Sequence, residues 1–155
     1  MILPGAKAPA FQLPALTGEN WALADALSKG PLVLAFFKIA CPTCQFTLPF
    51  LNRMATAAGG SLRVVGISQD DASGTGQFLE RFAPGLPTLL DSEGGYLTSK
   101  AFGITHVPSV FIVEQDGTIA GAADGFHKQM MEDLGVRGGV PAFLPGEQVP
   151  EMRPG

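Results

Sequence analysis

The order of hydrophobic and polar positions along the chain predicts alternating strands and helices. Residues 32–37 form a continuous apolar run, which is typical of a strand buried on both faces of a sheet. From Pro42 the apolar residues recur at helical spacing as far as Gly59, with Pro49 expected to kink this helix. The same reasoning predicts further strands at 62–67, 88–90, 110–113 and 118–121, and further helices at 70–83, 96–102 and 127–134.

Turn signals organise these elements into one α/β sandwich with a mixed sheet. Residues 17–20 read as the turn of a small N-terminal hairpin, which a short helix ending near Gly30 should follow. The Asp116-Gly117 step predicts an antiparallel hairpin between the last two strands. Strand–helix alternation closed by such a hairpin is typical of an α/β domain, here residues 1–135. Residues 136–155 are rich in Pro and Gly and predict an extended tail, either mobile or laid along the domain.

Composition excludes several classes of function. The 155 residues are 46% hydrophobic, enough for one domain with its own core. A net charge of −4 and the absence of any Lys/Arg run argue against nucleic acid or an anionic membrane as partner. No leader and no apolar run of spanning length is visible, so we expect a soluble monomer, cytoplasmic as written, or of the cell envelope if a leader was removed.

Chemistry is concentrated in the chain's two cysteines, Cys41 and Cys44, which directly follow the apolar strand at 32–37. A strand that feeds a helix places such residues at the helix N-terminus, where free backbone N–H groups and the helix dipole favour a thiolate. Since the thiolate is the nucleophile, Cys41, nearer the start of the helix, is the expected attacking group. Cys44 lies one turn on and is placed to resolve a mixed disulfide at Cys41.

Three neighbours of this pair are candidates for supporting roles. Pro42 suits the first helical turn, where its missing N–H is not needed. Lys38 either adds positive charge near the site or is simply solvated. Thr43 lies between the cysteines. An inert pair of core cysteines is the alternative, but a Cys-x-x-Cys motif at a strand–helix junction favours redox chemistry.

Beyond the motif at 41–44, three stretches resemble the thioredoxin superfamily, and in particular its redoxin, or AhpC/TSA, branch with the TlpA- and ResA-like thiol-disulfide oxidoreductases and the peroxiredoxins. They are the opening at 5–13, the segment at 65–70 with its following helix, and residues 102–113 with Asp116-Gly117. The resemblance implies a thioredoxin-like three-layer sandwich. It also implies that the Val107–Pro108 bond is cis and faces Cys41, and that the backbone of Val107 pairs with an extended substrate.

The chain departs from the superfamily pattern at three positions near the cysteines. Ala40 replaces a common tryptophan, Ala35 a buried carboxylate, and Thr47 a common glutamate. The usual proton acceptor for Cys44 is therefore absent. Thr43 or Thr47 could orient a water molecule in its place, although threonine itself is no base at neutral pH.

Two alternatives to disulfide exchange follow from the same resemblance. A peroxiredoxin-like thiol peroxidase, an antioxidant, would need a threonine, a proline and an arginine at positions that are Lys38, Leu34 and Pro108 here. A soft-metal module binding copper would use Cys41, Cys44 and His106. The copper-binding members of the superfamily have a wider cysteine spacing.

We therefore expect a thiol-disulfide oxidoreductase. Cys41 and Cys44 would exchange disulfides with protein substrates and a redox partner protein. Apart from this redox-active disulfide, we expect no cofactor and no metal. The sequence leaves the direction of electron flow open, because the two residues between the cysteines do not fix the reduction potential.

Overall fold

Strand β3 (Leu32–Phe37) is the centre of the fold, and all six of its residues are buried. The structure is a computed structural model that describes residues 1–155. Strand β3 pairs in parallel with one neighbour and antiparallel with the other, so the sheet is mixed, as predicted, with the order β5-β4-β3-β6-β7. Those partner strands are β4 (Val64–Ser68), β5 (Thr88–Leu90), β6 (Ser109–Val113) and β7 (Ile119–Asp124).

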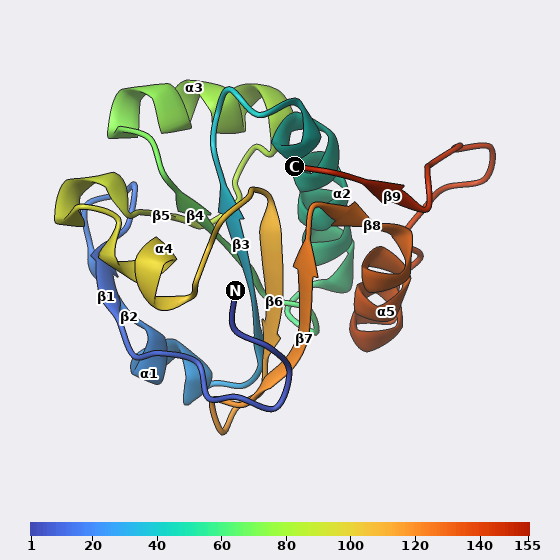
Figure 1. Cartoon of the computed structure of the whole chain (residues 1–155). Coiled ribbons are helices and arrows are strands. Elements are labelled where there is room, and N and C mark those ends of the chain that lie inside the picture. The colour runs from blue at the N-terminus through green and yellow to red at the C-terminus, as the bar shows by residue number, and fades with distance from the viewer.

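Helices and two small sheets surround this central sheet (Figure 1). The N-terminal hairpin predicted from the turn at 17–20 is present as β1 (Gln12–Pro14) and β2 (Asn20–Ala22). No helix has the length and apolar character that a membrane crossing requires. The helices are α1 (Leu23–Leu27), α2 (Pro42–Ala58), α3 (Ala72–Phe82), α4 (Leu97–Ala101) and α5 (Lys128–Gly138), with a 3-10 turn at Ser92–Gly94.

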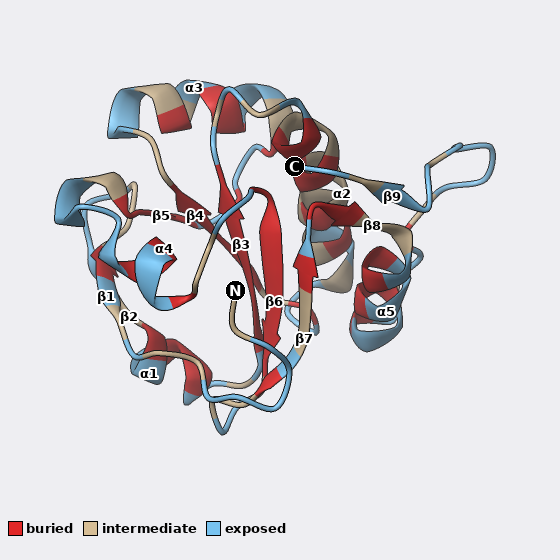
Figure 2. Cartoon of the chain, viewed as in Figure 1, coloured by how far each residue is buried: buried red, intermediate tan, exposed pale blue.

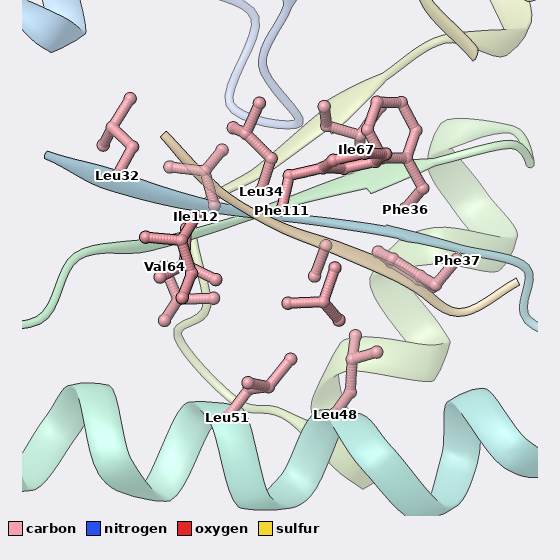
Figure 3. Close-up of a cluster of buried hydrophobic side chains, with 14 of the residues drawn as sticks. Leu32, Leu34, Phe36, Phe37, Leu48, Leu51, Val64, Ile67, Phe111 and Ile112 are labelled. Atoms are coloured by element: carbon pink, nitrogen blue, oxygen red, sulfur yellow. The ribbon is translucent and has the colours of Figure 1, made fainter. Parts of the chain in front are cut away.

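Alternate residues of β3 pack against different layers, because successive side chains in a strand point to opposite faces. The ring of Phe36 contacts Phe102 and Phe111, whereas the ring of Phe37 stacks on Phe78 of α3 at a centroid distance of 5.0 Å. Leu48 and Leu51 point from α2 toward the sheet (Figure 3), and Figure 2 shows the central strands as the continuous buried layer of the molecule. The predicted three-layer sandwich is thereby confirmed.

The C-terminal part is longer and better packed than its composition indicated. Helix α5 was expected to end at Leu134, but it runs to Gly138. Glycine permits this: a Cβ at Gly135 would lie 2.7 Å from the Val140 carbonyl oxygen, so the returning chain packs directly against the helix. Ala142 then joins the core, and Phe143 and Val149 pack against it.

A last pair of short strands was not predicted. Strand β9 (Met152–Arg153) pairs antiparallel with β8 (Phe126–His127), so the end of the described chain lies beside the strand that precedes α5. In Figure 1 it lies close to the beginning of α2. A two-residue strand carries no readable period, which is why the pattern did not reveal it.

Candidate active site

The site lies where the carboxyl end of β3 meets the beginning of β6. These strands run antiparallel, and Phe36 is paired with Ser109, so the loop after β3 and the loop before β6 emerge side by side. The first loop ends at Cys41 and the second contains Val107 and Pro108. Topology alone therefore brings together residues that are 66 positions apart in sequence.

Cys41 is the N-cap of α2. Its Sγ accepts a hydrogen bond from the Cys44 amide at 3.2 Å, while its S–H donates to the Val107 carbonyl oxygen at 3.4 Å. The Val107–Pro108 bond is cis, as predicted. Pro42 occupies the first turn of the helix, also as predicted. The Cys41 sulfur is thus held at the start of the helix between one donor, the Cys44 amide, and one acceptor, the Val107 carbonyl.

Cys44 lies behind Cys41 and is fully buried. Burial raises the pKa of the Cys44 thiol, and the hydrogen bond to the Cys41 side chain raises it further. A hydrogen bond from the backbone of Lys38 opposes this shift, while the charges of Cys41 and Asp70 add to it. Both cysteines are thiols in this structure, and the geometry makes one of them accessible and the other sheltered.

Polar side chains fix the loop that carries Cys41. The Asp70 carboxylate accepts a hydrogen bond from the Ile39 amide at 2.9 Å, and the Gln45 amide donates to the Ile39 carbonyl at 3.0 Å. Asp70 was given no role at the site from the sequence alone. Its position right after β4 was the available signal, because the carboxyl ends of the parallel strands β3 and β4 share one edge of the sheet.

The loop that carries Pro108 is held in a similar way. The Ser109 hydroxyl donates to the His106 carbonyl at 2.7 Å, and the Gly125 amide donates to the Pro108 carbonyl at 2.7 Å. Ser109 and Pro108 are both buried. The peptide carbonyl that faces Cys41 is therefore part of a rigid segment rather than of a free loop.

The two threonines of α2 have different surroundings. The Thr43 hydroxyl donates to the Pro154 carbonyl at 2.6 Å, so it is engaged with the C-terminal segment. The Thr47 hydroxyl, fully buried one turn further on, has no hydrogen-bond partner. Lys38 is exposed at the end of β3, and its role stays a prediction.

His106 contacts Asp124 and Thr105 rather than a cysteine. Its Nδ1 lies 3.5 Å from the Asp124 carboxylate and 3.1 Å from the Thr105 hydroxyl, and the side chain is 61% exposed. No three Cys, His, Asp or Glu side chains are grouped as a metal ion would need. The structure therefore does not assemble the three ligands that the copper alternative requires.

The sequence profile of the AhpC/TSA family matches residues 4–122. The chain belongs to the AhpC/TSA family. This confirms the resemblance drawn from the motifs at 5–13, 41–44 and 102–113.

Named relatives of this AhpC/TSA protein include both thiol peroxidases and disulfide exchangers. Rv2521 of Mycobacterium tuberculosis, classed by its name as a peroxiredoxin, is 30% identical over 151 residues, which are 87% of this chain and 96% of that protein. The thiol:disulfide interchange protein DsbE of Yersinia pestis is 30% identical over 121 residues, 76% of this chain and 62% of DsbE. Since its relatives are named for these redox chemistries, this AhpC/TSA protein is an oxidoreductase.

Solved structures similar to this AhpC/TSA protein confirm its thioredoxin-like fold. A DsbE-type thiol:disulfide interchange protein from Chlorobium tepidum superposes with a TM-score of 0.76 at 24% identity, covering 88% of this chain and 96% of that one. The peroxidoxin BcpB of Mycobacterium tuberculosis gives 0.69 at 24% identity, covering 79% and 86%. One fold therefore accommodates both chemistries, and the residues around Cys41 must distinguish them.

Proposed function

We propose that this protein is a thiol-disulfide oxidoreductase in which Cys41 is the nucleophile and Cys44 the resolving thiol. The observation that carries the proposal is the pairing of one sulfur at a helix N-cap with a second, buried sulfur one turn behind it. The outer sulfur also faces the carbonyl before a cis-proline. This arrangement gives one cysteine access to a substrate and reserves the other for the second step.

In the reductive direction, the Cys41 thiolate attacks one sulfur of a substrate disulfide. That disulfide breaks, its second sulfur leaves as a thiolate that takes up a proton, and a mixed disulfide with Cys41 forms. Cys44 then gives up its proton and attacks the Cys41 sulfur. The bond between Cys41 and the substrate sulfur breaks, the substrate takes up a proton and leaves as a dithiol, and the two electrons it has gained come from the protein, which is left oxidised with a Cys41–Cys44 disulfide. Oxidation of a substrate is the reverse sequence.

The second step should be the slow one. Burial holds the pKa of the Cys44 thiol well above its ordinary value, and no carboxylate or histidine donates to or accepts from it. The mixed disulfide should therefore persist until Cys44 loses its proton, and longer at low pH than at high pH. This behaviour suits a protein that holds its substrate between the two steps.

Protein disulfides are the substrate class we propose. The rigid Val107 backbone next to Cys41 offers a hydrogen-bonding edge to an extended chain, the binding mode known as strand addition. Relatives named thiol:disulfide interchange proteins support the same class. A second protein that resets Cys41 and Cys44 would complete the cycle. We expect the protein to act as a monomer without a bound cofactor.

Peroxide reduction is the second candidate, because Rv2521 is 30% identical and is classed as a peroxiredoxin. Fast thiol peroxidases polarise the peroxide with donors beside the reacting sulfur. Here the hydrogen-bond partners of the Cys41 sulfur are the Cys44 amide and the Val107 carbonyl, with no hydroxyl or guanidinium among them. Cys41 should therefore react with peroxide at about the rate of an ordinary thiolate.

Three measurements test the assignment. Cys41→Ser should abolish reduction of insulin disulfides, whereas Cys44→Ser should accumulate mixed disulfides that mass spectrometry detects on Cys41. Retained turnover in Cys41→Ser would contradict the mechanism. Stopped-flow oxidation of Cys41 by hydrogen peroxide far faster than that of free cysteine would favour the peroxidase. The reduction potential of the Cys41–Cys44 pair then decides the direction, since a strongly reducing value indicates a reductase.

A further inference from the structure

The segment 151–155 lies across the proposed active site. Strand β9 pairs with the edge of β8, the Lys128 amide donates to the Glu151 carbonyl at 2.9 Å, and the Thr43 hydroxyl donates to the Pro154 carbonyl at 2.6 Å. Figure 1 shows β9 running toward the beginning of α2, where Cys41 is the N-cap. The segment is thus extended and bound largely through its backbone.

Gly155 lies directly on the backbone that faces Cys41. A Cβ at Gly155 would lie 2.7 Å from the Val107 carbonyl carbon and closer still to its oxygen. Strand β9 also lies directly against Gly125, the residue between β7 and β8, since a Cβ at Gly125 would lie 2.6 Å from the Arg153 carbonyl oxygen. A substrate that pairs with Val107 needs the space that Gly155 occupies. Segment 151–155 and such a substrate therefore exclude each other.

Two side chains of the segment make contacts: the exposed Glu151 carboxylate lies 3.7 Å from the Lys128 ammonium, and Arg153 packs on α2. The Arg153 guanidinium lies over the ring of Phe46, 5.0 Å from its centroid, and this ring belongs to the first turns of α2. A cation over an aromatic face is attracted by the negative face of the ring. The segment contains no cysteine, so it can occupy the site without reacting.

We propose that residues 151–155 occupy, within the same chain, the groove that binds an extended segment of the disulfide substrate, and that this groove prefers a basic side chain over Phe46. The inference rests on the proposed function, because it assumes that Cys41 exchanges disulfides with a polypeptide. The partner is an extended peptide with Arg or Lys two residues before the position that contacts Val107. A backbone carbonyl of this peptide would accept the hydrogen bond from the Thr43 hydroxyl that the Pro154 carbonyl accepts in this structure.

Substrate must displace the segment, so the apparent KM equals the KM of the open groove divided by the fraction of time that the groove is open. One hydroxyl hydrogen bond, one cation–π contact and one exposed ion pair, between Lys128 and Glu151, hold the segment beside its backbone pairing, so we expect partial occupancy. Gly155→Ala and Arg153→Ala should each lower the KM for insulin disulfides about three- to tenfold. Their rates with the small disulfide 2-hydroxyethyl disulfide, which needs no groove, should match the wild type. Leu144→Ala, an exposed change in the same part of the chain, is the control and should alter neither.

The preference for a basic side chain has its own test. The peptide Glu-Met-Arg-Pro-Gly, titrated calorimetrically into Gly155→Ala, should bind at least fivefold more tightly than Glu-Met-Glu-Pro-Gly. Phe46→Leu in the same background should remove most of this difference. Equal binding of the two peptides, or no binding of either, would overturn the proposal.

These outcomes separate the inference from the proposed function. If insulin reduction depends on Cys41 but the KM is the same in wild type, Gly155→Ala and Arg153→Ala, the segment is no competitor and the inference fails alone. If insulin reduction does not depend on Cys41, the proposed function fails. The calorimetric titration measures the groove without any turnover, so it still decides whether the peptide site exists.

Discussion

Replacing Thr47 by valine should make the protein more stable, although Thr47 lies in the helix that carries both cysteines. Its hydroxyl is fully buried and has no hydrogen-bond partner. Burying a hydroxyl without a partner costs about 1–3 kcal/mol in protein mutational data. Valine has nearly the same shape and helix propensity, so the substitution removes this cost without opening a cavity. We expect the free energy of unfolding to rise by about 1 kcal/mol or more, and Tm by about 2–4 °C.

Thr43→Val is the matched control, because Thr43 lies one turn earlier and is equally sheltered but has a partner. Its hydroxyl donates to the Pro154 carbonyl at 2.6 Å. Losing an ordinary hydrogen bond costs about 0.5–1.5 kcal/mol, and less where water can replace the donor. The two substitutions delete the same atom, so opposite signs would isolate the effect of the partner.

Denaturation by urea of the reduced protein, followed by circular dichroism, measures both variants at constant pH. Unchanged or reduced stability of Thr47→Val would refute the reasoning, since it would mean that the hydroxyl is already satisfied in solution. The same variant also tests a functional cost. If the Thr47 hydroxyl orients water for deprotonation of Cys44, Thr47→Val should be more stable yet release its mixed disulfide more slowly, a trade-off common at active sites.

Other predictions concern titrating groups. The pKa of Cys44 is raised in the folded state, so the protonated thiol stabilises the fold fully below the ordinary value of 9.0, and this stabilisation is lost as pH rises above it. The reduced wild type should therefore lose stability in urea titrations at alkaline pH, and Cys44→Ala should lose less. Asp70→Asn removes a charge that raises this pKa, so release of the mixed disulfide, followed by acid quench, should accelerate at a given pH. Hydrogen bonds to Arg53 lower the pKa of Glu147 from 4.5 to about 2, so the contact stabilises the C-terminal segment above pH 4.5 and is lost as pH falls toward 2. Hydrogen exchange of residues 142–147 should increase in that range and should be increased at every pH in Glu147→Gln.

The central sheet and the position of the cysteines were predictable because each depends on a local pattern. The run at β3 is apolar at every position, and buried strands of a mixed sheet require that. Cys41 and Pro42 carry the signal of a helix start in two adjacent residues. The cis state of the Val107–Pro108 bond came from the family resemblance, since no local pattern distinguishes it from a strand-entry proline.

The contacts that complete the site were not predictable, because they join residues far apart in sequence. Thr43 and Pro154 are separated by 111 positions, and neither residue type announces the other. The same holds for Asp70, whose hydrogen bond to Ile39 spans 31 positions. The parallel pairing of β3 and β4 puts Asp70 at the same edge of the sheet as Cys41, but it does not specify the hydrogen bond to Ile39. For the C-terminal segment, the Pro- and Gly-rich composition left open whether it is mobile or laid along the domain, because neither residue type specifies a partner.

The covered groove acts on substrate binding, and the buried Cys44 acts on resolution of the mixed disulfide. Together they favour substrate selectivity over a high rate of turnover. Occupancy of the groove by residues 151–155 weakens the binding of every polypeptide substrate equally, unless that substrate restores the contacts it displaces. These are the pairing with β8, the Thr43 hydroxyl and the Phe46 ring. Among polypeptide disulfides, only one that fits the groove should therefore reach Cys41 efficiently. Once it has reacted, the raised pKa of Cys44 delays its release. Weak competition at entry and slow resolution afterwards favour few, specific partners over rapid reduction of any exposed disulfide, and a comparison of insulin with a basic peptide disulfide in wild type and Gly155→Ala measures this selectivity directly.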